Sequence, residues 1–191
     1  MGELMALLVT SVLVNNVILT QFLGMCPFMG VSKKKSSAIG MGVAVVFVIV
    51  VAALVTYALY YLVLVPLQLE FMDLITFILV IASLVQLTEM FIKKTSPALY
   101  KSLGVYLPLI TTNCVVLNVC LVNIQNGYDF AHMIMYSVGT PMGFALVLYI
   151  FSTIRERLEL SDVPEFFKGN PIALVVAAIM SMAFTAFAGV I

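Results

Sequence analysis

Two cysteines have the type and placement to do redox chemistry, because each lies where an apolar stretch is interrupted. Cys26 falls between Gly24 and Pro27, and Cys114 ends a polar run that begins at Thr111. Thiolates bind soft metals and iron–sulfur clusters, and a cluster usually takes four of them. A cluster held by Cys26 and Cys114 would therefore need two thiolates from a second chain. Because free cysteine also packs as a small hydrophobe, ordinary packing is the alternative.

The third cysteine and one carboxylate have different expected roles. Cys120 lies six residues after Cys114, on a different helix face, and is expected to be structural. Three cysteines cannot all pair with one another, so no disulfide scaffold is expected. Glu89 lies inside an apolar run, where a carboxylate is a candidate for an ion path. The alternative for Glu89 is an interfacial ion pair with Lys93, four residues later.

A membrane-spanning framework has to position these residues. Of the 191 residues, 63% are hydrophobic and 9% are charged, a composition far from that of a soluble domain. A helix crosses the bilayer core of about 30 Å with roughly 20 apolar residues. The sequence therefore predicts an all-α integral membrane protein. Its six predicted transmembrane helices cover about 4–23, 38–65, 74–92, 102–123, 132–152 and 171–190.

The basic residues predict how these helices are oriented. All nine Lys and Arg lie in three clusters, at 33–35, 93–101 and 155–168. Cationic loops stay in the cytoplasm, so all three clusters are expected there and both termini outside. The six spans leave no room for a soluble domain, and no basic face with interleaved aromatics supports nucleic-acid binding. We therefore expect a single membrane domain over 1–191, embedded in the lipid bilayer.

The two halves of the chain echo each other. Residues 14–19 (VNNVIL) are similar to residues 112–117 (TNCVVL), which pairs Asn15 with Asn113. Three spans per half is an odd number, so the repeats 1–97 and 98–191 must be inverted in the membrane. Pro27, with Gly24 and Gly30 on either side, predicts that helix one is interrupted near Cys26, and helix four, which contains Pro108 and the polar run before Cys114, is also expected to be interrupted. In membrane proteins, inverted repeats with broken helices form binding sites near the midplane of the bilayer. Secondary transporters are one class with this arrangement.

Several long runs closely resemble the Rnf/Nqr membrane-subunit family. They are 21–34 (QFLGMCPFMGVSKK), 89–91 (EMF), 96–104 (SPALYKSLG), 107–114 (LPLITTNC) and 154–158 (IRERL). The resemblance spans essentially the full chain. It implies a subunit of an ion-translocating complex in a prokaryotic inner membrane that passes electrons between reduced ferredoxin and NAD. The sodium-pumping NADH:quinone reductase is the alternative within the family.

The resemblance also implies a cofactor and partners. In this family, two homologous six-span subunits of opposite orientation share a [2Fe–2S] cluster, and each gives two cysteines. Carried over by motif, the ligands here are Cys26 and Cys114, whereas Cys120 matches no motif position. The other implied partners are flavin-bearing membrane subunits, which hold the flavins, and a cytoplasmic iron–sulfur subunit. No complete active site or catalytic residue is expected on this chain alone.

Two other functions remain compatible with the residues themselves. A secondary transporter would share the inverted repeats and broken helices but would not depend on the thiols. A structural assembly subunit would need neither a substrate cavity nor a cofactor. Both alternatives predict that Cys26 and Cys114 are dispensable.

Overall fold

The structure is helical throughout the residues that it describes. The computed structural model describes residues 2–32, 35–67, 70–95, 109–110, 112–161 and 164–188. Its elements are α1 Gly2–Val9, η1 Thr10–Val14, α2 Val17–Gln21, α3 Met25–Val31, α4 Lys35–Leu59, η2 Tyr60–Leu64, α5 Val65–Leu67, η3 Glu70–Met72, α6 Asp73–Thr95, α9 Cys114–Gln125, α10 Phe130–Glu159, η4 Glu165–Phe167 and α11 Asn170–Ala188. Here η1 and η2 are π-helical, and η3 and η4 are 3₁₀-helical. The all-α prediction is confirmed for these residues.

Three helical stretches are long and apolar enough to cross a membrane. They are Lys35–Leu67, which joins α4, η2 and α5, then Asp73–Met90 of α6, and Phe130–Glu159, which is α10. They match the predicted spans at 38–65, 74–92 and 132–152. Three shorter apolar helices, Leu4–Val14, Cys114–Gln125 and Asn170–Ala186, fall on the other predicted spans. The six-span topology itself stays a prediction, and part of the span at 102–123 lies outside the described residues.

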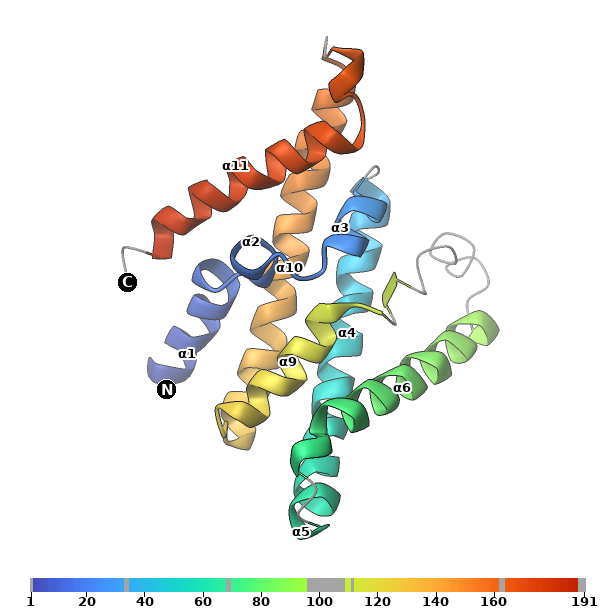
Figure 1. Cartoon of the computed structure of the whole chain (residues 1–191), viewed down its shortest axis with the longest axis vertical. Coiled ribbons are helices and arrows are strands. Elements are labelled where there is room, and N and C mark those ends of the chain that lie inside the picture. Colours follow the sequence, from blue (N-terminus) through green and yellow to red (C-terminus); the bar gives the residue numbers. More distant parts are fainter. Residues whose placement is uncertain are drawn as a thin grey trace.

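The packing of α4 against α10 forms the centre of the molecule (Figure 1). A Cβ atom added to Gly42 of α4 would lie 2.9 Å from Ala145 Cβ of α10, so small residues meet where the helices touch. Such residues let helix backbones approach closely in lipid. Helix α9 packs on α4, while α1 and η1 pack on α10. Helix α9, which begins at Cys114, and helix α3, which contains Cys26, both contact α4.

Helix α6 leans away from α4 and α10 in Figure 1. Its exposed side chains are largely apolar and include Ile75, Leu79 and Leu87. Lipid tails are as apolar as these side chains, so such a face can contact either lipid or an apolar partner helix.

The first helix is interrupted just before Cys26, in the predicted segment, but not at Pro27. Cys26 and Pro27 lie in the first turn of α3, where the missing N–H of proline breaks no helical hydrogen bond. The backbone leaves the helical region at Phe22 (φ 54°) and Gly24 (φ 79°) instead. A second break, at residues 15–16, separates η1 from α2. The break at Gly24 lies within the segment predicted to be interrupted, whereas the non-helical backbone that Pro27 predicts at Cys26 is not found.

Two of the three basic clusters, the first and the third, lie close together in the structure. Lys35 of the first cluster forms an ion pair with Glu156, next to Arg155 and Arg157 of the third, at 2.8 Å. Lys93 and Lys94 lie at the end of α6. Residues 33, 34 and 101 lie outside the described part of the chain, as does Pro108. The ion pair supports one common side for the first and third clusters.

Candidate functional site

Both candidate thiols lie at the start of a helix. Cys26 is the second residue of α3, and Cys114 is the first residue of α9. A helix N-terminus presents free N–H groups and a partial positive charge, which favour anionic groups such as thiolates. Each of these helices comes directly before the longest helix of its half, α4 or α10. The two halves thus place a thiol at a corresponding point of the chain.

A hydrogen bond joins the two interrupted segments. The backbone N–H of Gly24 donates to Cys114 Sγ, with an N···S distance of 2.9 Å. Gly24 precedes Cys26 by two residues, which span at most about 7 Å of extended chain. A Cβ atom added to Gly24 would lie 2.8 Å from side-chain carbons of both Phe144 and Val115. Glycine is therefore required for both the positive φ and the close approach.

Two buried asparagines form matching N-caps beside these breaks. The Asn16 side chain accepts from the Ile18 N–H at 3.2 Å, and that of Asn113 accepts from the Val115 N–H at 3.1 Å. Their backbone angles also agree, with φ and ψ of −69° and 113° for Asn16 and −71° and 112° for Asn113. The sequence echo paired Asn15 with Asn113, so the caps shift that correspondence by one residue. Such caps satisfy helix N–H groups that lipid cannot.

Both thiols reach the surface of this chain. Cys114 lines an apolar pocket of about 280 Å³ between α6 and the start of α9. Its other lining residues are Ile78, Ile81, Ala82, Thr112, Asn113 and Leu117. Cys26 is not among them. The two thiol-bearing segments are therefore linked by the hydrogen bond from Gly24 to Cys114, and the thiols do not line one pocket. Ligands at a chain surface are accessible to a second chain.

The thiol-bearing helix α3 is held at its other end by α10. Arg155 is only 4% exposed and donates to the Met29 carbonyl at 2.9 Å and to Ser32 Oγ at 2.8 Å. The rings of Phe28 and Phe151 stack with centroids 4.1 Å apart. A helix of seven residues is too short to be stable alone. These contacts therefore fix its position, a role for Arg155 that the sequence did not indicate.

The remaining predicted residues lie apart from this contact. Cys120 is buried in the core, as a structural cysteine would be, and its role stays a prediction. Glu89 is half-buried in α6, one turn before Lys93, and its part in ion movement stays a prediction. Among the residues that the structure describes, no three His, Cys, Asp or Glu side chains form a group able to hold a metal ion.

Comparison with known proteins decides the family. Residues 4–191 match the family described as "Rnf-Nqr subunit, membrane protein". The chain belongs to the Rnf-Nqr family. This result confirms the resemblance that was based on the motifs around Cys26 and Cys114, and it agrees with the long apolar helices.

Relatives within the Rnf-Nqr family are similar over almost their whole length. The chain is 54% identical to the A subunit of the Na(+)-translocating ferredoxin:NAD(+) oxidoreductase complex of Acetobacterium woodii over 186 residues, 97% of each protein. It is 53% identical to the A subunit of the ion-translocating oxidoreductase complex of Hahella chejuensis, which covers 100% of this chain and 99% of that protein. The protein of the same name from Shewanella oneidensis is 51% identical, over 100% of both.

Proposed function

We propose that this chain is the A subunit of an Rnf-type ion-translocating oxidoreductase complex in a prokaryotic inner membrane. The proposal is supported by family membership and by identities of 51–54% to subunits of that name. In this role the chain has no complete active site of its own. The complex would pass electrons between reduced ferredoxin and NAD and couple that transfer to ion movement.

Cys26 and Cys114 are proposed as half of the ligand set of a [2Fe–2S] cluster. The observation that carries this proposal is the 2.9 Å hydrogen bond from the Gly24 N–H to Cys114 Sγ, which brings together the two segments that contain the thiols. A homologous six-span subunit of opposite orientation would supply the other two thiolates. When bound, such a cluster supplies one-electron transfer inside the membrane.

The residues of this chain prepare the site in three ways. The N-termini of α3 and α9 favour anionic sulfur at Cys26 and Cys114. The Gly24 N–H stabilises negative charge on Cys114 Sγ, and hydrogen bonds to cysteine sulfur are one determinant of a cluster's reduction potential. The pocket beside Cys114 has a largely apolar lining, and electrostatic interactions are stronger in such low-dielectric surroundings.

The remaining parts of the proposal concern topology and partners. The halves 1–97 and 98–191 would be inverted three-helix repeats, with both termini outside and the basic loops in the cytoplasm. A cytoplasmic iron–sulfur subunit would deliver electrons, which would leave toward flavin-bearing membrane subunits that hold the flavins. Glu89 is the proposed carboxylate on the ion path.

Paramagnetic resonance of the chain co-expressed with its homologous partner tests the ligand assignment. Cys26→Ser and Cys114→Ser should each abolish the cluster signal, whereas Cys120→Ser, the matched control, should retain it. Both proteins of the pair must still be recovered together, so that loss of signal is not loss of assembly. Normal cluster signal and electron transfer in either ligand variant would reject the assignment and favour a secondary transporter or a structural role in assembly.

A further inference from the structure

Arg155 is a buried cation whose hydrogen-bond partners are all neutral. Its guanidinium is 4% exposed and donates to the Met29 carbonyl, Ser32 Oγ and Asn170 Oδ1 at 2.9, 2.8 and 3.2 Å. Among the described residues no carboxylate forms an ion pair with it, and the adjacent Glu156 pairs with Lys35 instead. A buried charge without a counter-ion is strongly unfavourable. The surroundings of Arg155 therefore favour an anion.

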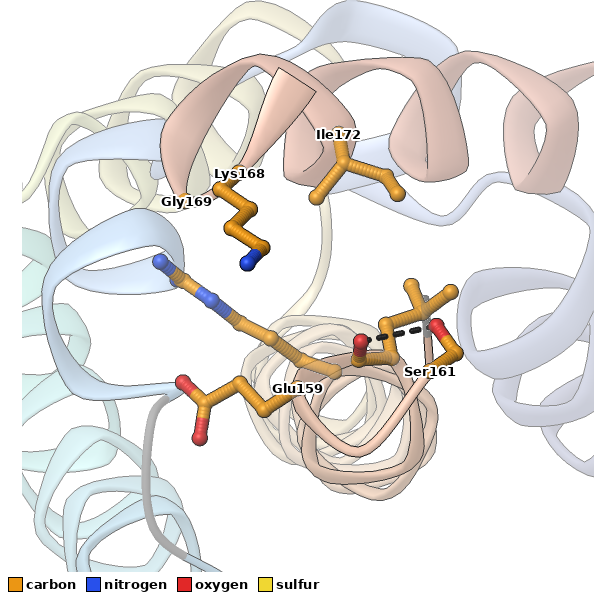
Figure 2. A pocket seen from close by; sticks show the side chains of 7 residues that line it. Glu159, Ser161, Lys168, Gly169 and Ile172 are labelled. Atoms are coloured by element: carbon orange, nitrogen blue, oxygen red, sulfur yellow. Dashed lines mark hydrogen bonds between the residues drawn. The ribbon is translucent and has the colours of Figure 1, made fainter. Parts of the chain in front are cut away.

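A pocket of about 160 Å³ opens beside this guanidinium. Among the residues that the structure describes, Arg155, Lys168 and one carboxylate, that of Glu159, line it, and these three carry a net charge of one positive unit. Figure 2 shows the Lys168 side chain extending into the pocket from the chain just before α11. Ile172 forms part of the apolar wall. The pocket thus offers two cations and an apolar surface to one ligand.

The position of the pocket along α10 gives its depth in the membrane. Helix α10 has 30 residues. At 1.5 Å per residue it is about 45 Å long, close to the thickness of a bilayer with its headgroups. Arg155 lies four residues before the end of this helix, Glu159. With α10 spanning the bilayer as proposed, the pocket is placed at the level of the lipid phosphates, on the side that the basic residues assign to the cytoplasm.

The segment that borders the pocket exposes large apolar side chains. Leu160 is 88% exposed, Phe166 is 94% exposed and Phe167 is 52% exposed. Side chains of this kind at headgroup level enter the boundary of the acyl chains. A free anion would make no favourable contact with these apolar side chains. A phospholipid offers a phosphate to the cations and acyl chains to the apolar side chains.

We propose that this pocket binds the phosphate of an anionic phospholipid. Lys168 and Arg155 contact the phosphate, and the exposed side chains at 160 and 166–167 pack on the acyl chains. The site is separate from the cysteine pair. It also places a lipid counter-ion next to the residue that anchors α3.

Lipid binding to the intact complex tests the proposal. Native mass spectrometry in detergent measures retention of added phosphatidylglycerol and, separately, phosphatidylcholine. Lys168→Gln removes one cation and leaves the hydrogen bonds of Arg155 in place, while Lys94→Gln, an exposed lysine at the end of α6, is the matched control. Wild type and K94Q should prefer phosphatidylglycerol. The K168Q variant should bind it about fivefold more weakly, as expected for loss of one cation near an anionic surface.

Four results would overturn the proposal. One is equal phosphatidylglycerol affinity in K168Q and wild type, and another is equal affinity of wild type for phosphatidylcholine. Full displacement of the lipid by millimolar inorganic phosphate would assign the pocket to a free anion. Loss of a co-purifying subunit from K168Q, with lipid binding unchanged, would assign it to an acidic group of a partner protein.

Discussion

Gly24 and Cys114, 90 residues apart in the sequence, are joined by a hydrogen bond of 2.9 Å between a backbone N–H and a sulfur atom. The donor lies in the segment that breaks the first helix, and the acceptor begins α9. Because the amide of Gly24 points at the sulfur, the geometry of one interruption determines the surroundings of the thiol in the other. This dependence can be tested by substitution at the glycine.

Gly24→Ala should lower both stability and cluster content. Alanine at φ 79° is strained, and its Cβ would meet Phe144 and Val115 at 2.8 Å. The combined penalty is about 1–3 kcal/mol in the free energy of unfolding, and relief of the clash moves the amide away from Cys114. Gly127→Ala is the control, because Gly127 also has a positive φ, 58°, but no neighbour within 4 Å. Equal cluster content in the two variants would refute the role of the Gly24 contact.

Arg155→Ala should be strongly destabilising, by about 3 kcal/mol, because it leaves the buried Ser32 hydroxyl and two part-buried acceptors, on Met29 and Asn170, without their donor. Arg157→Ala, two residues away and exposed, should change the free energy of unfolding little. The measurement is denaturation in mixed micelles, followed by circular dichroism. If the two substitutions have equal effects, the anchoring of α3 by Arg155 is disproved.

Gly143→Ala should disturb the packing of η1 on α10. An added Cβ would lie 2.6 Å from the Val12 carbonyl oxygen, and backbone cannot rotate away as a side chain can. The expected loss in the free energy of unfolding is about 1–3 kcal/mol. Met142→Ala, at an exposed position in the same turn, is the control. A variant as stable as this control would show that η1 can shift at no cost.

Glu89→Gln should reduce the number of ions moved per electron while electron transfer continues. Glutamine keeps the size of the side chain but cannot carry the negative charge that an ion path needs. Reconstituted complex, assayed for ion uptake and NAD reduction together, gives the ratio. Glu165→Gln, in the exposed η4 segment, should leave that ratio unchanged. An unaltered ratio in E89Q would remove Glu89 from the ion path.

The long helices could be predicted from sequence because their signal is local. The predicted spans 74–92 and 132–152 lie within α6, Asp73–Thr95, and α10, Phe130–Glu159. The site of the first interruption could not be predicted in the same way. Proline is compatible with the first turn of a helix as well as with a break, so Pro27 alone does not distinguish them. Contacts from α9 and α10 to Gly24 decide where the backbone turns.

The role of Arg155 in holding α3 could not be predicted from the sequence either. Arg155 and Arg157 belong to one basic cluster, yet one is buried and the other exposed. Residues two apart do not share a helix face, and only tertiary packing determines which face meets α3. The positions of the thiols followed from motifs, whereas the Gly24 amide that contacts Cys114 required the structure.

Iron and acid-labile sulfide analysis, on this chain alone and on the chain paired with its homologous partner, tests the central claim most directly. The proposed half-site predicts about two iron and two sulfide per pair and none in the isolated chain, because each chain offers two of four thiolates. A complete cluster on the isolated chain, or a stable pair that contains no iron, would contradict it.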